Sequence, residues 1–391
     1  MIKNEKWEKV FLGEIADEII ERIDNPSQSG FELFVGLEHF ISGDLKIKQW
    51  GSTKNLVSAM KKFQKGDILF ARRNAYLKRS SIVQFDGVCS GDAFVIREKK
   101  DRLVPGFLAF IFNSESLWNY ANSYAAGTMS KRVKWRDLAK YSFKLPPLDE
   151  QRRLADLLWS VDETITAYEE LLSQELLTRS VVLKDVFLSK TCKITSINKL
   201  PIKEINGMWK TVEAKDVMPV SIIRSTEIRP YGEISYNTAQ KHVVKKSQFA
   251  DKKLIPGDII IERSGGGPDQ PVGRVCYFNK VDGNYTFSNF TSVIRIEDQN
   301  EVLPRYLFKF LLFFYEMKGT DRLQKQTTGI RNLDYDLYRK IKIPMRNIEE
   351  QKECINIIEN VEKNRRNVEA YIVLVQRIQK QIINQIFGGK P

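Results

Sequence analysis

The sequence predicts an α+β protein made of two tandem copies of one plan: an α/β module with a curled central sheet, followed by a long helix. Three observations lead to this fold class. Segments of the two halves of the 391-residue chain match in the same order, positive charge is concentrated in two large blocks, and two shorter blocks carry the apolar spacing of a coiled coil.

The internal repeat consists of five pairs of similar segments in collinear order. The pairs are Lys6–Val10 with Met208–Val212, Lys65–Arg72 with Pro256–Arg263, Ser90–Arg97 with Ser288–Arg295, Val104–Leu108 with Leu303–Leu307, and Leu148–Gln151 with Ile348–Gln351. Their offset stays between 191 and 202 residues. A repeat of this length is a duplicated domain and is far larger than one turn of a solenoid.

Net charge divides the chain into four blocks. Module 1 (residues 1–148) has a net charge of +7 and module 2 (residues 191–348) has +9, whereas spacer helix 1 (residues 149–190) has −4 and spacer helix 2 (residues 349–391) has +1. Because the excess positive charge lies in the modules, we predict that the modules are the binding surfaces. A field of this sign favours a polyanionic partner, above all double-stranded DNA.

Each module is predicted to contain both β-strands and α-helices. Short β-type runs bounded by Gly, Asp and Asn predict strands at residues 68–71, 81–85, 93–97, 259–261, 274–278 and 292–296. Helices are predicted at residues 107–113 and 306–313, just after Pro105 and Pro304, because proline is favoured in the first turn of a helix. Trp7 is predicted to pack in a core, as is Trp209 in the second copy.

The two spacer blocks each predict one long helix. Ten positions in each block alternate in steps of four and three residues, from Leu154 to Val186 and from Cys354 to Ile386, and sixteen of these twenty residues are apolar. This spacing is typical of a coiled-coil seam. If the termini of each module lie close together, the second helix runs back along the first, and the pair is antiparallel. A helix of about 35 residues would span about 52 Å.

Full overlap of the two helices pairs residues whose numbers sum to 540. This register sets Glu175 opposite Arg365. We predict an ion pair between these two side chains, and we expect it to select the register rather than to add stability, because desolvation offsets most of the attraction.

The first pair of candidate DNA-reading loops follows the 68–71 and 259–261 strands. Arginine can donate two hydrogen bonds to guanine, asparagine can form two hydrogen bonds with adenine, and lysine commonly contacts a backbone phosphate. The candidates in module 1 are Arg72, Arg73, Asn74, Tyr76, Lys78 and Arg79, with an ordinary solvated loop as the alternative. Those in the glycine-rich stretch of module 2 are Arg263, Gln270 and Arg274, with a tight glycine turn as the alternative.

A second pair of loops occupies matching places before the last strand of each module. The candidates are Thr128, Ser130, Lys131 and Arg132 in module 1, and Thr328, Arg331 and Asn332 in module 2, with an ordinary turn as the alternative. Apolar residues of the spacer helices outside the seam, Leu157 and Tyr371 among them, give the helices more hydrophobic surface than one partner helix can cover. Packing against the chain's own modules and docking of another protein are the two interpretations.

Several classes of protein are disfavoured by the sequence. It contains no methyl-transfer motif, no G-x-G-x-x-G and no P-loop lysine, and its cysteines are too scattered for a structural zinc site. We therefore predict no catalytic residues and no metal site. The absence of a signal-like start and of a membrane-length apolar run predicts a cytoplasmic protein.

The chain resembles, over its whole length, the specificity subunit of Type I restriction-modification enzymes. The resemblance rests on Pro146–Gln151 opening a long helix, the Lys/Pro-Gly-Asp-Ile strands, the tryptophan near the start of each copy and the two-copy plan. The second copy departs from the first at Pro344–Gln351, which is two residues longer and lacks the second proline.

The resemblance implies a non-catalytic subunit for host defence and DNA methylation. Its modules would be target-recognition domains that read a bipartite, asymmetric site, and its helices would dock two modification (methyltransferase) subunits and restriction (translocase and nuclease) subunits. S-adenosylmethionine and ATP would bind those partners, and this chain would hold no cofactor. The alternatives are a stand-alone DNA methyltransferase or endonuclease with divergent motifs, and a protein-binding scaffold.

Overall fold

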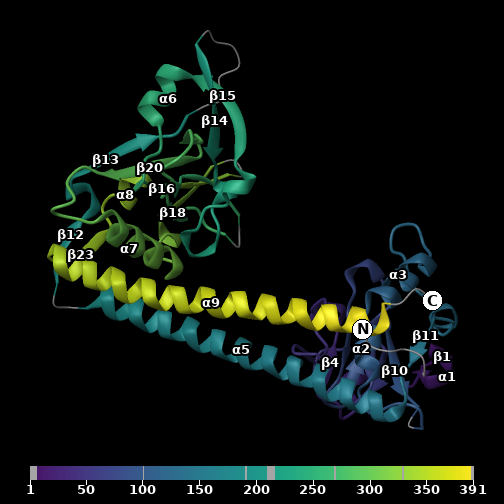
Figure 1. The fold of residues 1–391 in the computed structure, drawn as a ribbon. Coiled ribbons are helices and arrows are strands. Elements are labelled where there is room, and N and C mark those ends of the chain that lie inside the picture. Colours follow the sequence, from purple (N-terminus) through teal and green to yellow (C-terminus); the bar gives the residue numbers. More distant parts are fainter. Residues whose placement is uncertain are drawn as a thin grey trace. The chain divides into compact units, whose positions relative to one another are not determined.

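The fold of the chain was analysed in a computed structural model (Figure 1). The structure describes residues 7–99, 101–189, 192–208, 216–267, 270–327 and 330–388. Two compact units divide the chain: residues 1–172 with 367–391, and residues 173–366. Each unit therefore contains one predicted module together with a segment of each long helix.

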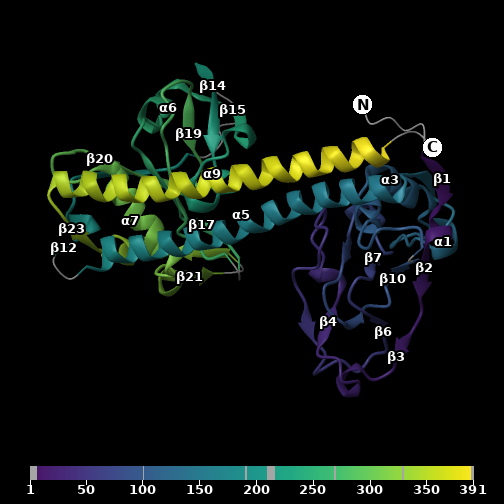
Figure 2. The ribbon, with the colours of Figure 1, turned by 60° about the horizontal axis from the view of Figure 1, so that its bottom comes forward.

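The first compact unit combines helices and sheets, as the sequence predicted, and it contains two larger sheets. One sheet has the order β2 (Ala16–Ile19), β10 (Ala93–Glu98), β7 (Ile68–Ala71), β8 (Ser80–Ile82). The other has the order β3 (Arg22–Ile23), β6 (Met60–Phe63), β9 (Gly87–Cys89), β4 (Leu33–Val35), β5 (Gly51–Ser52), and can be followed in Figure 2. Strands β1 (Glu8–Phe11) and β11 (Ser142–Leu145) pair separately, and the short helices are α1 (Leu12–Ile15), α2 (Leu108–Phe112), α3 (Glu115–Tyr124) and α4 (Trp135–Leu138).

The second compact unit repeats this plan. Its four-stranded sheet has the order β13 (Ile202–Asn206), β20 (Thr291–Ile296), β16 (Ile259–Glu262), β18 (Val275–Tyr277), and the terminal pair is β12 (Lys193–Ser196) with β23 (Lys342–Met345). Two three-stranded sheets are β15 (Gln240–Lys245), β14 (Val217–Ile223), β19 (Tyr285–Phe287), and β17 (Ser264–Gly266), β22 (Ile330–Leu333), β21 (Gln324–Thr327). The helices are α6 (Lys246–Lys252), α7 (Pro304–Glu316) and α8 (Tyr335–Tyr338).

The repeated Gly-Asp-Ile segments have the same structural role in both copies. Asp67 accepts two hydrogen bonds from the Arg97 guanidinium, at 2.7 and 2.8 Å, and also accepts the Gln64 backbone N–H. Asp258 does the same for Arg295, at the same two distances. Both carboxylates are buried, so each depends on its arginine for compensation of its charge.

The repeated glutamine at the start of each long helix joins the helix to its module. The buried amide of Gln151 accepts the Val104 N–H at 3.0 Å and donates to the carbonyl oxygens of Arg102 and Pro146. Gln351 accepts the Leu303 N–H at 2.8 Å and likewise donates to two carbonyl oxygens. Three hydrogen bonds from one side chain explain why glutamine recurs at these two positions.

The two long helices are α5 (Leu148–Leu188) and α9 (Ile348–Phe387), which confirms the long-helix prediction. Helix α5 begins directly after Pro146 and Pro147, as in the sequence prediction. Helix α9 begins instead with a capping box. Asn347 accepts the Glu350 N–H and Glu350 accepts the Asn347 N–H, which replaces the missing second proline as the start signal.

Within each compact unit, the segments of α5 and α9 pack side by side in antiparallel directions (Figure 1, Figure 2). In the first unit the rings of Tyr168 and Tyr371 stack at 5.7 Å, close to the predicted register. None of the twenty predicted seam positions is exposed. Each unit's helix segments also share its core, as Leu158 and Ile383 do with Phe110 and Trp118.

The predicted ion pair between Glu175 and Arg365 is wrong. The guanidinium of Arg365 is buried against the Tyr231 ring, at 3.8 Å, and its Nη2 lies 3.8 Å from the Glu233 carboxylate. The charge contact between the helices joins Arg179 to Glu362 instead, at 3.5 Å. The register argument considered only the two helices, whereas module 2 supplies partners to the buried arginines of the seam.

Candidate nucleic-acid interface

The two predicted loops of module 1, which are more than fifty residues apart in the sequence, lie together in the structure. Arg73 and Arg132 form an isolated antiparallel bridge. The Asn74 N–H donates to the Lys131 carbonyl oxygen at 2.9 Å, and Nε of Arg73 donates to Oγ of Ser130 at 2.6 Å. The loop after β7 and the loop before α4 therefore form a single cationic surface.

A single carboxylate braces this surface. Asp92, at the start of β10, accepts a hydrogen bond from Nε of Arg132 at 2.9 Å, and Nη1 of Arg73 lies 3.6 Å from it. The hydrogen bond from Arg132 is the largest cause of a lowered pKa of Asp92, so the carboxylate stays charged over the physiological range. One negative charge thus orients an arginine from each loop.

The remaining candidates of the first loop flank a short 3₁₀ turn at Ala75–Leu77. Asn74 and Lys78 have left-handed backbone conformations, with φ of 55° and 49°. Tyr76 is 65% exposed at the turn, which leaves its ring available to a ligand. Lys78 is paired with Glu115, and Arg79 donates to the Leu37 carbonyl oxygen at 3.0 Å, so these two cations support the loop. Thr128 is exposed on the second loop.

Module 2 brings its two loops together in the same way, here as a sheet. Strand β17 of the glycine-rich loop pairs with β22, with Ser264 opposite Asn332 and Gly266 opposite Arg331. The hydroxyl of Ser264 donates to the Asn332 side-chain oxygen. Arg331 and Asn332 therefore lie beside the glycine-rich loop, whereas Thr328 lies outside the described residues.

Glycine is required in this loop on steric grounds. Gly265 has φ of 109°, and a Cβ on Gly266 would lie 2.6 Å from the Gln270 carbonyl oxygen. Gly265 and Gly266 lie in strand β17, and the Gly267 N–H then closes a turn by donating to the carbonyl oxygen of the exposed Gln270 at 2.9 Å. A backbone without side chains also allows a ligand to approach closely, so the turn does not argue against DNA contact.

Arg274 differs from the other candidates because its guanidinium is largely committed within the protein. It forms two hydrogen bonds to the buried carboxylate of Glu262, at 2.9 and 2.7 Å, and one to the Ser225 carbonyl oxygen at 3.0 Å. We therefore expect Arg274 to hold the loop in place rather than to read a base.

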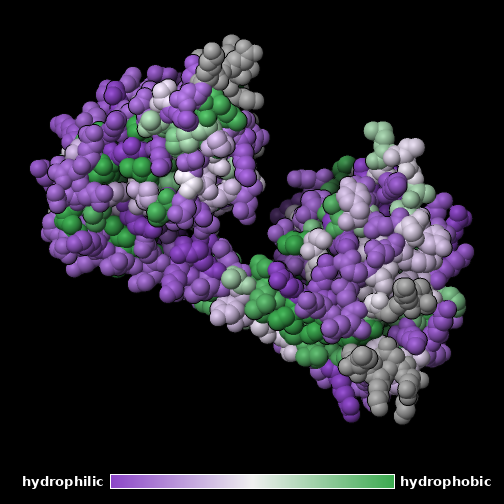
Figure 3. Space-filling model, turned by 45° about the horizontal axis from the view of Figure 1, so that its top comes forward, coloured by the Kyte–Doolittle hydropathy of each residue, from purple (hydrophilic) through white to green (hydrophobic). Residues whose placement is uncertain are grey.

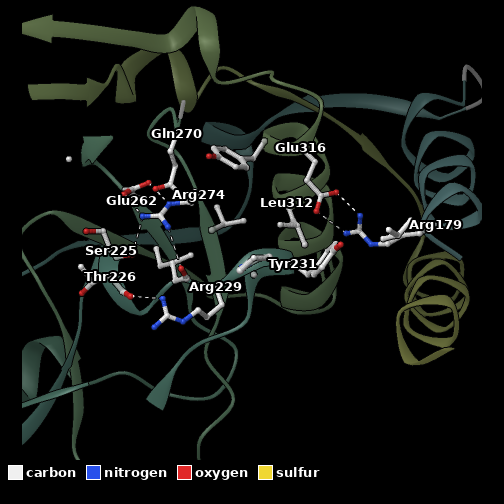
Figure 4. A pocket seen from close by; sticks show the side chains of 17 residues that line it. Arg179, Ser225, Thr226, Arg229, Tyr231, Glu262, Gln270, Arg274, Leu312 and Glu316 are labelled. Atoms are coloured by element: carbon white, nitrogen blue, oxygen red, sulfur yellow. Dashed lines mark hydrogen bonds and ion pairs between the residues drawn. The ribbon is translucent and has the colours of Figure 1, made fainter. Parts of the chain in front are cut away.

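A cavity of about 870 Å³ lies between this loop, α7 and the α5 segment of the second unit (Figure 4). The Arg274–Glu262 pair lines one side of it, and Arg179, which holds Glu316 at 2.7 and 3.0 Å, lines the opposite side. Each of these two arginines faces a carboxylate and is therefore already paired within the protein. A third arginine of the lining, Arg229, donates to the Thr226 carbonyl oxygen at 3.0 Å.

The sequence analysis did not single out the carboxylates that brace these loops, Asp92 and Glu262. Glu262 directly precedes the candidate Arg263, and an acidic residue beside a candidate arginine was a signal that the sequence offered, because a buried carboxylate needs a cationic partner. Asp92 lies between Gly91 and Ala93, away from the candidate arginines in the sequence, so only the structure identifies it.

Apolar residues of the long helices outside the seam have both fates that the sequence analysis left open: Leu183 and Ile355 are buried in the core of the second unit, and others are exposed. The exposed residues include Leu157 (47%), Leu171 (38%), Tyr371 (51%) and Leu374 (47%) in the first unit, and Leu177 (67%) and Val181 (58%) in the second. Figure 3 shows a hydrophobic area along the helices. In the described part of the chain, no helix has the length and apolar character needed to cross a membrane.

Comparison with known proteins identifies the family. The family model described as Type I restriction modification DNA specificity domain matches residues 4–178 and 206–372. The EcoKI specificity subunit of Escherichia coli K12 is 23% identical over 355 residues, which cover 85% of this chain and 73% of that protein. The match to the Escherichia coli EcoDI specificity subunit is 24% identical over 164 residues, 41% of this chain, and spans only 36% of that relative.

The fold is also that of a solved S subunit of a Type I restriction-modification system from M. genitalium. The TM-score is 0.57 at 13% identity, and the match covers 100% of this chain and 99% of that one. Since the family model covers most of both copies of the repeat, the chain belongs to the family of Type I restriction-modification DNA specificity domains, which recognise DNA sequence.

Proposed function

We propose that each module reads one half of a bipartite, asymmetric DNA site with the two loops that the fold brings together. The observation that carries this proposal is the duplicated juxtaposition: loop residues far apart in sequence meet at Arg73 and Arg132 in module 1 and at Ser264 and Asn332 in module 2. The two modules present different side chains at these places, so the two half-sites should differ in sequence.

We further propose that the long helices dock two modification subunits and the restriction subunits. Apolar side chains such as Leu171 and Leu374 are exposed on the helices, and apolar surface of this kind marks protein interfaces. In this assembly the chain has no catalytic residue and no cofactor of its own. S-adenosylmethionine and ATP bind the partner subunits, and this chain determines where on the DNA they act.

The test is an exchange of module 2. Residues 191–348 are replaced by the corresponding segment of a related specificity subunit, and methylated bases are mapped in cells that also contain the modification subunits. We expect one half of the mapped site to change while the other half and its methylation persist. The matched control replaces residues 1–148 and should change only the other half. A change in both halves after either exchange would contradict independent reading by the two modules.

Salt dependence supplies an independent test. Binding of the assembled complex to duplex DNA should weaken steeply between about 50 and 200 mM salt, because each phosphate contact releases condensed counterions. An affinity that is constant over this range would exclude the loops as a cationic DNA-binding surface.

A further inference from the structure

One arginine has the same surroundings in both modules. Arg72 directly follows β7, and Arg263 occupies the matching position after β16. The Arg72 N–H donates to the Asp92 carbonyl oxygen at 3.0 Å, and its own carbonyl oxygen accepts the Val133 N–H at 2.9 Å. The Arg263 N–H donates to the Phe290 carbonyl oxygen, and its carbonyl oxygen accepts the Leu333 N–H, both at 2.8 Å. The backbone therefore places the two side chains equivalently.

Each of these guanidinium groups lies over an aromatic ring. The guanidinium carbon of Arg72 is 5.2 Å from the centre of the Phe94 ring, and that of Arg263 is 3.7 Å from the centre of the Tyr335 ring. Trp135, which matches Tyr335 in module 1, packs edge-on against Phe94. An aromatic ring restricts the orientation of an arginine without using its hydrogen-bond donors.

Neither guanidinium has a hydrogen bond or an ion pair with another described residue, and the buried Nε of each is without a partner. The neighbouring arginines differ: Arg73 and Arg132 face Asp92, and Arg274 faces Glu262. Burial lowers the pKa of Arg263, and the charges of Glu204 and Asp336 offset this effect only in part. Asp92 interacts with Arg72, and Glu204 and Asp336 interact with Arg263, only at longer range. Among the described residues, each module thus holds an oriented arginine that no carboxylate engages through a hydrogen bond or an ion pair.

The residues that follow the two arginines are different. Module 1 continues with Arg73-Asn74-Ala75-Tyr76, whereas module 2 continues with Ser264-Gly265-Gly266-Gly267. Side chains that differ between the modules suit bases that differ between the half-sites. A feature shared by both modules suits a group that every half-site shares, and in duplex DNA that group is the backbone phosphate.

We propose that Arg72 and Arg263 each donate hydrogen bonds to a backbone phosphate, one in each half-site, and so contribute to affinity without contributing to base preference. A guanidinium can donate hydrogen bonds to two phosphate oxygens, and the phosphate would supply the hydrogen-bonded counter-charge that neither arginine has among the described residues. This assignment rests on the proposed function, since it assumes that the loops face DNA.

The experiment measures the affinity of the complex with its modification subunits for two duplexes, one that carries the mapped site and one that does not, over a series of salt concentrations. We expect Arg72→Gln to weaken binding to both duplexes by the same factor, roughly tenfold, and to reduce the slope of log K against log salt by about one. Arg263→Gln should do the same. The methylation map should stay unchanged for both variants.

Matched controls remove the same charge elsewhere. Lys144 on β11 and Lys342 on β23 are exposed and lie outside the loops, so Lys144→Gln and Lys342→Gln should leave the slope unchanged. Arg72→Lys keeps the charge on a different head group and should retain most of the slope. If Arg72→Gln fails to fold, Arg263→Gln tests the same assignment in module 2.

Two results would overturn the assignment. An unchanged salt slope in both Arg72→Gln and Arg263→Gln would exclude a phosphate contact, and an altered base preference in one half of the mapped site would make the substituted arginine a base reader. Failure of the proposed function would look different, because the unsubstituted complex itself would then show no preference for the mapped duplex.

Discussion

Gln151 is the residue through which module 1 holds the start of α5. Its amide satisfies one buried N–H and two carbonyl oxygens. The change Gln151→Leu leaves these groups without that partner and should lower the free energy of unfolding of the first unit by about 2–5 kcal/mol. Urea unfolding followed by tryptophan fluorescence measures this well, because five of the six tryptophans lie in residues 1–172.

The control for this prediction is Gln174→Leu, at an exposed position of α5, which should change the free energy of unfolding by less than about 0.5 kcal/mol. If Gln151→Leu is as stable as the control, the three hydrogen bonds do not join the helix to its module.

Asp92 connects the two loops of module 1 and should control the balance between specific and non-specific binding. The change Asp92→Asn removes the negative charge that orients Arg73 and Arg132. We expect non-specific DNA affinity to rise several-fold and preference for the mapped site to fall, because the cations remain but are less well placed. Asp101→Asn, an equal charge change at an exposed position, should not reduce the preference.

The pH dependence of the contacts between Asp92 and the two arginines follows from the direction in which the pKa of Asp92 is shifted. The hydrogen bond from Arg132 lowers the pKa of Asp92 below its ordinary value of 3.8. A carboxylate with a depressed pKa contributes stability above its unfolded-state pKa and loses it only as the pH falls through the folded-state value. Site preference should therefore be the same at pH 5 and pH 8. If the preference for the mapped site is already lost at pH 5, a titratable group other than Asp92 orients the two arginines.

The sequence predicted the residue types of the candidate site better than their roles. It identified the arginines of both first loops, because cations between two strands are visible in a single sequence. It did not distinguish Arg274, which is committed to Glu262, from Arg263, which has no carboxylate partner. That distinction depends on which carboxylate faces which arginine, and spacing alone does not provide it.

At the scale of elements, the helix seam is supported by its most buried apolar residues. Leu158 is fully buried and shares a core with Ile383 of α9. Leu158→Ala removes three carbons and leaves a cavity, which should cost about 2–5 kcal/mol of unfolding free energy. Its sequence neighbour Leu157 is 47% exposed, so Leu157→Ala should cost less than about 0.5 kcal/mol. If urea unfolding gives the same loss of unfolding free energy for both variants, the seam residues do not hold the two helices together.

The elements that the sequence predicted well are those with a strong local pattern. Strand β7 has the predicted bounds, and α7 extends the predicted helix at both ends. The five-stranded sheet of module 1 was not predicted, because strands as short as β3 and β5 have two residues each and no periodicity to detect. The predicted Glu175–Arg365 pair failed for a related reason, since Tyr231 and Glu233 approach the seam from outside the helices.

For the whole molecule, the duplicated plan was predictable because similar segments occur twice in the sequence, in the same order. Equivalent positions in the two copies have equivalent roles, as Asp67 and Asp258 show at the strands and Gln151 and Gln351 at the helix starts. A repeated residue with a repeated contact is therefore structural or serves a shared ligand. Positions that differ between the copies are the places to look for the sequence preference of each module.

Under the proposed function, the two half-sites are separated by an unread gap, and the length of this gap should follow the length of the paired helices. Seven residues inserted after Leu172 in α5 and seven after Arg366 in α9 keep the seam pattern and lengthen the pair by about 10 Å, or about three base pairs of duplex. With the modification subunits present, the mapped site should keep both half-sites and gain about three base pairs between them. Affinity should fall, because DNA must untwist to present both halves.

A heptad inserted in α5 alone should abolish site-specific methylation, since the seams no longer match. If the lengthened chain still methylates the original spacing, the helices do not set the gap.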